Sequence, residues 1–149
     1  MGKIEDEMNT KFADDKHKML ANIIFSAQWI KGRFSSFMDQ YGLSSPQFNV
    51  LRILRGDGDW LNMNEMKSRM IEKSPNTTRL CDKLIEKDLI VRRRCDEDRR
   101  VVFLKISETG LKLLKKIDDE NDGSHMAFME NLTKKEANEL SDILDKLRG

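Results

Sequence analysis

Apolar residues recur along this chain with two spacings, and these predict a mostly helical α+β fold that contains one small pair of strands. Over residues 12–40 the apolar side chains return every three or four positions, which is the spacing of one helix face. Shorter stretches repeat the pattern. We therefore expect helices over residues 12–40, from Ser45 to about Leu54, over 63–71 and 75–87, from 107 to about 131 with an interruption at Gly123, and from Thr133 to about Leu147.

The stretch between residues 89 and 106 alternates instead, and it predicts a β-hairpin. Leu89 to Cys95 and Arg100 to Ile106 are rich in β-branched and apolar residues, and the second run places alternate apolar side chains on a common face. The charged segment 96–100 lies between the two runs. We expect it to form an exposed hairpin tip.

Capping residues place the helix starts in the middle of the chain. Ser45 precedes Pro46, and Ser74 precedes Pro75, an arrangement that suits the first turn of a helix. Asn62, with Glu65 three residues later, predicts a capping box for the helix 63–71. Its inward face should consist of Met66, Met70 and Ile71.

The order of these elements is that of a winged helix-turn-helix. A helix over 63–71 and a helix over 75–87 are separated by a short turn, and the strand pair follows directly. A helix with a polar start can reach base edges in the major groove of DNA. The hairpin tip can reach the adjacent minor groove.

Charge is distributed unevenly, although the formal net charge of the 149 residues is only +1. Residues 67–105 hold 12 Lys/Arg against 7 Asp/Glu, whereas residues 116–149 hold 5 against 9. A basic middle and an acidic end predict one face that meets phosphate and another that does not. A mixed, solvated surface is the simpler alternative.

Several function classes find no support in the sequence. The chain has no Gly-rich phosphate loop, nucleophile elbow or metal-ligand cluster, so we expect neither an enzyme nor a bound cofactor. It has no apolar run that would span a bilayer and no signal-peptide core, and its two cysteines form no disulfide framework. These features predict a cytoplasmic location.

The central stretch resembles the multiple-antibiotic-resistance (MarR) family of winged helix-turn-helix transcription regulators. The resemblance rests on the sequence Ser74 to Leu80, on Asp98-Arg99-Arg100, and on Ser107 to Gly110 after the second strand. Ile106-Ser107 replaces the usual Leu-Thr pair of the family, and Asp96 stands where proline is frequent. The resemblance extends from about residue 12 to the C-terminus.

The resemblance implies roles for matching residues. Arg100 would enter the minor groove, held by Asp98, and Arg79 would be the main base-reading side chain in the major groove. At least one arginine of the run 92–94 would lie near phosphate. The expected DNA-binding residues are Ser74, Asn76, Thr77, Thr78, Arg79, Lys83, Arg92, Arg94, Asp98, Arg99 and Arg100.

The outer helices are expected to pair two copies of the chain. We interpret residues 1–149 as one domain, in which 12–42 and 107–149 form a helical dimerisation layer and 45–106 forms the DNA-binding lobe. A two-fold dimer would place its recognition helices about 34 Å apart, which is one duplex turn, so its operator would be a pseudo-palindrome.

Other residues that could react or bind a ligand have simpler explanations. Cys81 is expected to pack in the core and Cys95 to be incidental, with a redox role as the alternative. His17 and His125 have no metal-ligand spacing. Five apolar residues could line a cleft for an anionic aromatic ligand, although core packing is the simpler reading: Phe25, Trp29, Phe48, Met126 and Phe128.

These expectations converge on a homodimeric double-stranded DNA-binding repressor that a small, phenolic or anionic aromatic molecule releases from its operator. Two alternatives remain open. One is a winged-helix module that binds proteins rather than DNA, and the other is a constitutive or redox-responsive regulator that has no small-molecule effector.

Overall fold

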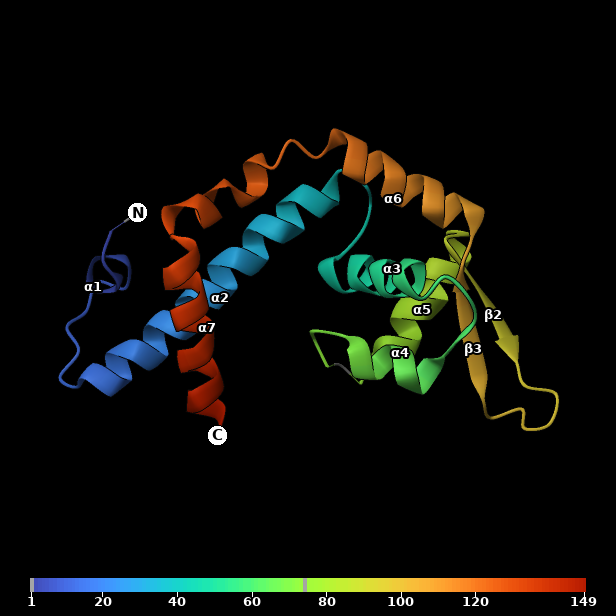
Figure 1. Cartoon of the computed structure of the whole chain (residues 1–149), viewed down its shortest axis with the longest axis horizontal. Helices are drawn as coiled ribbons and strands as arrows, with labels where there is room; N and C mark the ends of the chain where they lie inside the picture. The colour runs from blue at the N-terminus through green and yellow to red at the C-terminus, as the bar shows by residue number, and fades with distance from the viewer. Residues whose placement is uncertain (1, 74) are drawn as a thin grey trace. The chain divides into compact units, whose positions relative to one another are not determined.

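The computed structural model describes residues 2–73 and 75–149, and the chain divides into two compact units, Met1–Asp118 and Asp119–Gly149 (Figure 1). The first unit contains all the strands. Its elements are α1 (Ile4–Glu7), α2 (Asp15–Asp39), α3 (Ser45–Asp57), β1 (Leu61–Asn62), α4 (Met63–Arg69), α5 (Thr77–Glu86), β2 (Ile90–Arg94), β3 (Val102–Ile106) and most of α6 (Glu108–Glu120). The second unit contains the end of α6, the 3-10 helix η1 (Ser124–Asn131) and α7 (Lys134–Arg148).

The predicted hairpin forms the wing of the fold. β3 lies between β1 and β2 in a three-stranded antiparallel sheet, with Ile90 opposite Ile106 and Arg94 opposite Val102. The strands are shorter than expected because the tip closes on itself. The Val101 amide donates to the Asp98 carbonyl at 3.0 Å, which ends the ladder before the charged turn.

α3 lies at the centre of the core, as its apolar sequence predicts. Val50, Leu51 and Leu54 are fully buried, and α3 contacts α2, α4, α5 and β3. On β3, Leu104 is fully buried and Val102 and Ile106 turn to the same side, so the predicted common face is confirmed. Because α3 supports both helices of the helix-turn-helix and the wing, it sets their relative positions.

The helix caps and starts differ from the expected ones in three places. The cap of α3 is Ser44 rather than Ser45, and it forms a reciprocal capping box with Gln47. The Asn62 side chain caps α4 as expected, but Glu65 pairs with Arg69 instead of completing a capping box. The recognition helix α5 begins at Thr77, two residues after the expected start.

The junction between α5, the wing and α6 requires a glycine at position 110. A Cβ atom on Gly110 would lie 2.2 Å from the Leu89 carbonyl oxygen, so any side chain would collide with the backbone. The Ser107 hydroxyl donates to the Asp88 carbonyl at 2.5 Å and accepts from the Gly110 amide at 3.0 Å. Asp88 has a φ of +59°, a left-handed conformation that aspartate adopts more readily than most residues.

The outer helices follow the expected pattern with local differences. Before residue 12, α1 buries Ile4 and contacts α2. Gly123 has a φ of +76° and separates α6 from η1, which is a 3-10 helix rather than α-helical. The last helix is capped by Thr133, where its start was expected, and Thr133 and Glu136 form a capping box. None of the helices in the described residues has the length and apolar run needed to cross a membrane.

Candidate nucleic-acid interface

The outward face of α5 carries most of the predicted major-groove residues. Thr78, Arg79 and Lys83 are exposed, and so is Asn76 at the helix start. Thr77 is an exception, because only 1% of it is exposed and its hydroxyl donates to the Met70 sulfur at 3.8 Å. Its predicted base contact is therefore wrong: the residue packs the helix start onto α4. Ser74 lies outside the described residues.

The hairpin tip presents Arg100 in a fixed orientation. The Arg100 guanidinium donates to both carboxylate oxygens of Asp98, at 3.0 and 3.2 Å, and its amide donates to the same carboxylate at 3.1 Å. These bonds lower the pKa of Asp98, the side-chain bond having the largest effect. The Arg100 side chain is nevertheless 91% exposed. Arg99 is also exposed, and its carbonyl accepts from Arg94 at 3.0 Å.

The three consecutive arginines of β2 alternate between two sides, as residues of a strand must. Arg92 and Arg94 face the groove beside α5. Arg93 points the other way, and its guanidinium lies 4.6 Å from the Trp60 ring centroid and 5.7 Å from that of Phe103. Arg93 thus holds the base of the wing by cation–π contacts, and it is absent from the groove.

A groove of about 530 Å³ joins the helix-turn-helix to the wing. It brings together Thr78 of α5, Arg92 and Arg94 of β2, and the Asp98–Arg100 pair. It also contains three polar residues of the β1–α4 segment that were absent from the sequence-based set: Asn62, Asn64 and Lys67. Nothing local in the sequence marked them, because the groove forms only where the fold brings α4 and β2 together.

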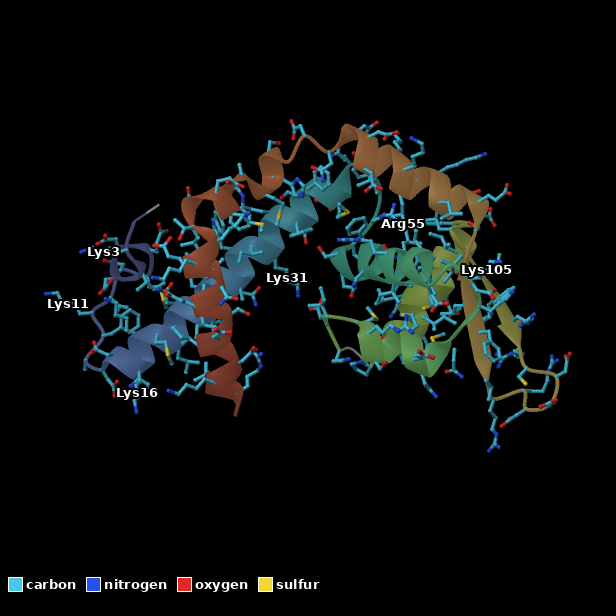
Figure 2. All side chains as sticks on the ribbon, in the orientation of Figure 1. Lys3, Lys11, Lys16, Lys31, Arg55 and Lys105 are labelled. Atoms are coloured by element: carbon cyan, nitrogen blue, oxygen red, sulfur yellow. The ribbon has the colours of Figure 1, made fainter. Side chains whose placement is uncertain are left out.

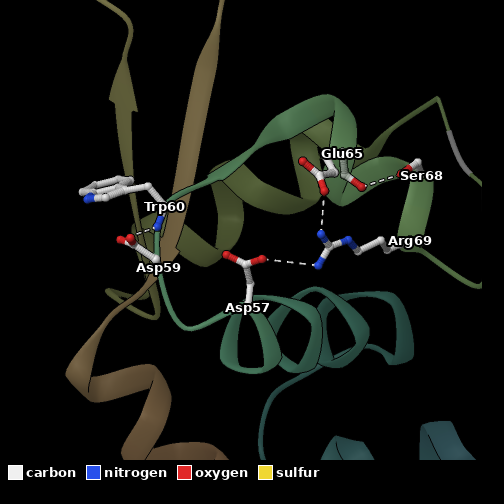
Figure 3. A network of polar contacts seen from close by, with 6 residues as sticks. All are labelled: Asp57, Asp59, Trp60, Glu65, Ser68 and Arg69. Atoms are coloured by element: carbon white, nitrogen blue, oxygen red, sulfur yellow. Dashed lines mark hydrogen bonds and ion pairs between the residues drawn. The ribbon is translucent and has the colours of Figure 1, made fainter.

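Two ion-pair networks fix the walls of this groove. Arg69 joins α4 to α3, with its guanidinium 2.6 Å from Glu65 and 3.4 Å from Asp57 (Figure 3). The bond to Glu65 is the main reason that the pKa of Arg69 is raised. On the other side, Arg92 donates to Asp82 of α5 at 2.9 Å. The second bond ties the wing strand directly to the recognition helix.

A second cavity, of about 550 Å³, lies between α2, α3 and the segment that precedes α5. Its lining is mostly apolar and includes Phe48, a predicted ligand residue, together with Ile30 and Phe34 of α2. Phe25 and Trp29 are not among its lining residues, and Trp29 is covered by Arg33 at 4.8 Å. Met126 and Phe128 belong to the second unit.

Ile71 and Glu72 form one wall of this cavity. Ile71 is 90% exposed, which corrects its predicted inward position: α4 ends at Arg69, so Ile71 has left the helix. Glu72 pairs with Lys31 of α2 at 2.5 Å, and Figure 2 labels Lys31 on that helix. Ser45 also lines the cavity, and its buried hydroxyl has no hydrogen-bond partner among the described residues.

The two cysteines differ in burial. Cys81 is 1% exposed, and burial, followed by the nearby Asp82 charge, raises the pKa of its thiol to about 11. Core packing of Cys81 is therefore confirmed. Cys95 is half-buried at the end of the wing strand. No group of three or more potential metal ligands occurs among the described residues.

Comparisons with known proteins identify relatives of this arrangement. A family model described as "Transcriptional regulator SarA/Rot" matches residues 33–117, which include the complete helix-turn-helix and wing. The HTH-type transcriptional regulator MhqR of Bacillus subtilis is 26% identical over 118 residues, which cover 79% of this chain and 81% of MhqR.

Two solved structures extend the likeness to nearly the whole chain. A mutant MarR from E. coli, in complex with operator DNA, has a TM-score of 0.77 at 20% identity, covering 92% of this chain and 99% of MarR. At that identity the likeness shows the fold. NadR in complex with 4-hydroxyphenylacetate has a TM-score of 0.64 at 25% identity, covering 93% of this chain and 94% of NadR.

Proposed function

Because the chain belongs to the SarA/Rot family of transcriptional regulators, with a MarR-type winged helix-turn-helix that binds DNA, we propose that it is a homodimeric repressor of a pseudo-palindromic operator. In this proposal α5 enters the major groove and the 96–100 tip enters the adjacent minor groove. The observation that carries it is the shared groove, which combines the polar face of α5 with a preoriented Arg100.

Arg79 and Arg100 have side-chain settings that suit different grooves of the duplex. Arg79, exposed in the first turn of α5, can present two donors to the O6 and N7 atoms of guanine. Arg100 is held away from the protein surface, and a narrow A·T-rich minor groove concentrates the negative potential that attracts such a side chain. The operator should therefore combine a guanine in each half-site with an A·T-rich flank.

Apolar residues exposed on the outer helices support pairing of two copies. On α2, Leu20 and Ile24 are 49% and 56% exposed, and on α7 Ile143 and Leu147 are 59% and 53% exposed. Apolar stripes of this length are costly to leave in water and are covered in dimers of helical proteins. Sedimentation at micromolar concentration should give twice the mass of one chain.

The cavity between α2 and α3 supports a small-molecule effector. Its apolar lining suits an aromatic ring, while Arg52 and Lys31 at its margin suit an acidic group. The buried Ser45 hydroxyl, which bonds to nothing in the part of the chain that the structure describes, offers a hydrogen bond to a ligand. NadR was crystallised with a ligand of this class, 4-hydroxyphenylacetate. Ile71 and Glu72 place the segment leading to α5 in the cavity wall, so an occupant would act on the recognition helix directly.

Selection of bound fragments from genomic DNA tests the proposed operator. We expect recovered sites to contain two inverted half-sites with centres about one duplex turn apart. Arg79→Ala should relax the base preference at one position of each half-site, whereas Lys112→Ala, an exposed change on α6, should leave it unchanged. Recovery of unrelated fragments with no shared half-site would contradict sequence-specific binding and favour a protein-binding module.

A separate measurement tests the effector. Operator affinity would be measured at fixed salt with and without benzoate and 4-hydroxyphenylacetate. An effector at this cavity should weaken operator binding by the wild-type protein and leave Phe48→Glu, which places a charge in the apolar wall, unaffected by the ligand. Identical operator-binding isotherms with and without these ligands would favour a constitutive regulator that has no small-molecule effector.

A further inference from the structure

We propose that Lys67 of α4 and Arg94 of β2 form a binding site for one phosphodiester group, and that this group is a backbone phosphate of the bound duplex. This inference rests on the proposed DNA binding and assigns a specific contact within it. Lys67 was not among the residues that the sequence indicated. It lies in the groove opposite the wing, where it and Arg94 belong to different walls.

Charge pairing distinguishes these two residues from the other cations of the groove. Arg92 donates to Asp82 at 2.9 Å, and Arg100 donates to Asp98 at 3.0 Å. Each of those guanidinium groups already faces a carboxylate. Lys67 and Arg94, by contrast, have no ion pair with any carboxylate in the described part of the chain, and the side-chain bond of Arg94 goes to the neutral Arg99 carbonyl at 3.0 Å.

Two unpaired cations that face one groove repel each other unless an anion lies between them. The groove volume of about 530 Å³ is ample for a phosphate group and its first waters. Arg94 keeps guanidinium donors that can bind two phosphate oxygens, and the Lys67 ammonium acts as a point charge. Side chains of Asn64 and Thr78 line the same groove and can donate to the remaining oxygens.

The position of the site identifies the source of the phosphate. The same groove is also lined by Thr78 on the α5 face and by Arg100 at the wing tip, the two parts that would enter neighbouring grooves. One strand of the backbone separates a major groove from the adjacent minor groove. That strand must pass between α5 and the wing tip, so one of its phosphates is the anion that would bind at the site.

The salt dependence of DNA binding tests the site. A lysine that binds phosphate contributes about one unit to the slope of log Kobs against log salt and carries no sequence information. We expect Lys67→Ala to weaken binding to the selected operator and to a scrambled duplex by the same factor, and to reduce the slope by about one. Lys67→Arg should restore both. Lys112→Ala is the matched control and should change neither.

A double-mutant comparison tests whether the two residues share one phosphate. If they do, the losses from Lys67→Ala and Arg94→Ala should be non-additive, because each change weakens the same contact. A neutral methylphosphonate, placed in turn at each backbone position of the operator, should abolish the effect of Lys67→Ala at one position per half-site. Additive losses, or no such position, would overturn the shared site.

Two further outcomes separate this inference from the function on which it rests. If the wild type binds the operator with a steep salt dependence and Lys67→Ala has the same affinity and slope, the site is wrong and the DNA-binding function stands. If the wild type shows no salt-dependent binding to DNA, both the phosphate site and the DNA-binding function are wrong. Titration with inorganic phosphate tests the source of the anion. The backbone assignment would be contradicted if the wild type bound free phosphate at millimolar concentration, the double variant did not, and the salt slope of duplex binding were the same for both proteins.

Discussion

The Asp98 carboxylate receives three hydrogen bonds from Arg100, one from its amide and two from its guanidinium. The pair spans only two residues, so it orients the arginine without support from the rest of the protein. We expect Asp98→Ala to weaken operator binding although it removes a negative charge from the interface. Arg100→Ala should cause a larger loss, measured by fluorescence anisotropy at fixed salt. Tighter binding by Asp98→Ala would show that the carboxylate acts only by repelling phosphate.

The same pair has a defined dependence on pH. Arg100 lowers the pKa of Asp98, so the folded state favours the carboxylate. The contribution of this pair is present above the ordinary pKa of an aspartate, about 3.9, and is lost as the pH falls through the lower folded value. The wing should therefore keep its orientation throughout the neutral range. An NMR titration should find Asp98 below its usual pKa, and Arg100→Gln should raise it.

Arg93 and Arg99 should separate wing stability from DNA binding. Arg93→Ala removes the contacts to Trp60 and Phe103 and should lower the free energy of unfolding by about 0.5–1 kcal/mol, measured by urea denaturation. Arg99→Ala should leave stability unchanged and weaken duplex binding, because its exposed side chain would face phosphate. Lower stability of Arg99→Ala together with weaker duplex binding by Arg93→Ala would contradict these roles.

Gly110 tests the junction between the wing and α6. A methyl group there would lie 2.2 Å from the Leu89 carbonyl oxygen, so Gly110→Ala should destabilise the protein by at least about 1–3 kcal/mol and lower its melting temperature. Gly56→Ala is the matched control, because a Cβ atom at this position in α3 meets nothing within 4 Å. The control should be neutral or slightly stabilising. Equal melting temperatures for the two variants would contradict the close approach.

Cys81 and Cys95 should differ in reactivity. Burial raises the pKa of the Cys81 thiol to about 11, so the thiol stays protonated and inaccessible in the folded protein. Alkylation at pH 8 should modify Cys95 quickly and Cys81 only after denaturation. Because the folded pKa exceeds the unfolded one, this thiol favours folding below about pH 8.5, and the contribution fades as the pH rises toward 11. Rapid alkylation of Cys81 in the native state would reopen a redox role.

The sequence predicted the elements well because their signals are local. The alternation of apolar residues along β3, the Asn62 cap and the start of the last helix after Thr133 each depend on neighbours along the chain, and each is confirmed. Thr77 and Ile71 were misplaced because their burial depends on where a helix begins or ends. A shift of one or two residues rotates a side chain from one face to another.

The site was predicted in part for a similar reason. Arg100 and Asp98 lie two residues apart, so their pairing could be expected from the motif, and the bonds between them are present. Lys67 reaches the groove because α4 packs against α3 and β3, and contacts between segments so far apart in the chain leave no local pattern in the sequence. The cavity lining was mostly missed, since the stripe of α2 that faces α3 contains Ile30 and Phe34 rather than Phe25 and Trp29.

The most direct test of the central claim compares the affinity of the wild type and Arg100→Ala for a selected operator and a scrambled duplex over 50–200 mM salt. We expect wild-type log Kobs to fall linearly with log salt, with the operator bound at least about 10³-fold more tightly. Arg100→Ala should lose much of that preference. Equal affinity for both duplexes, unchanged by salt and by the substitution, would contradict recognition of DNA by this helix and wing.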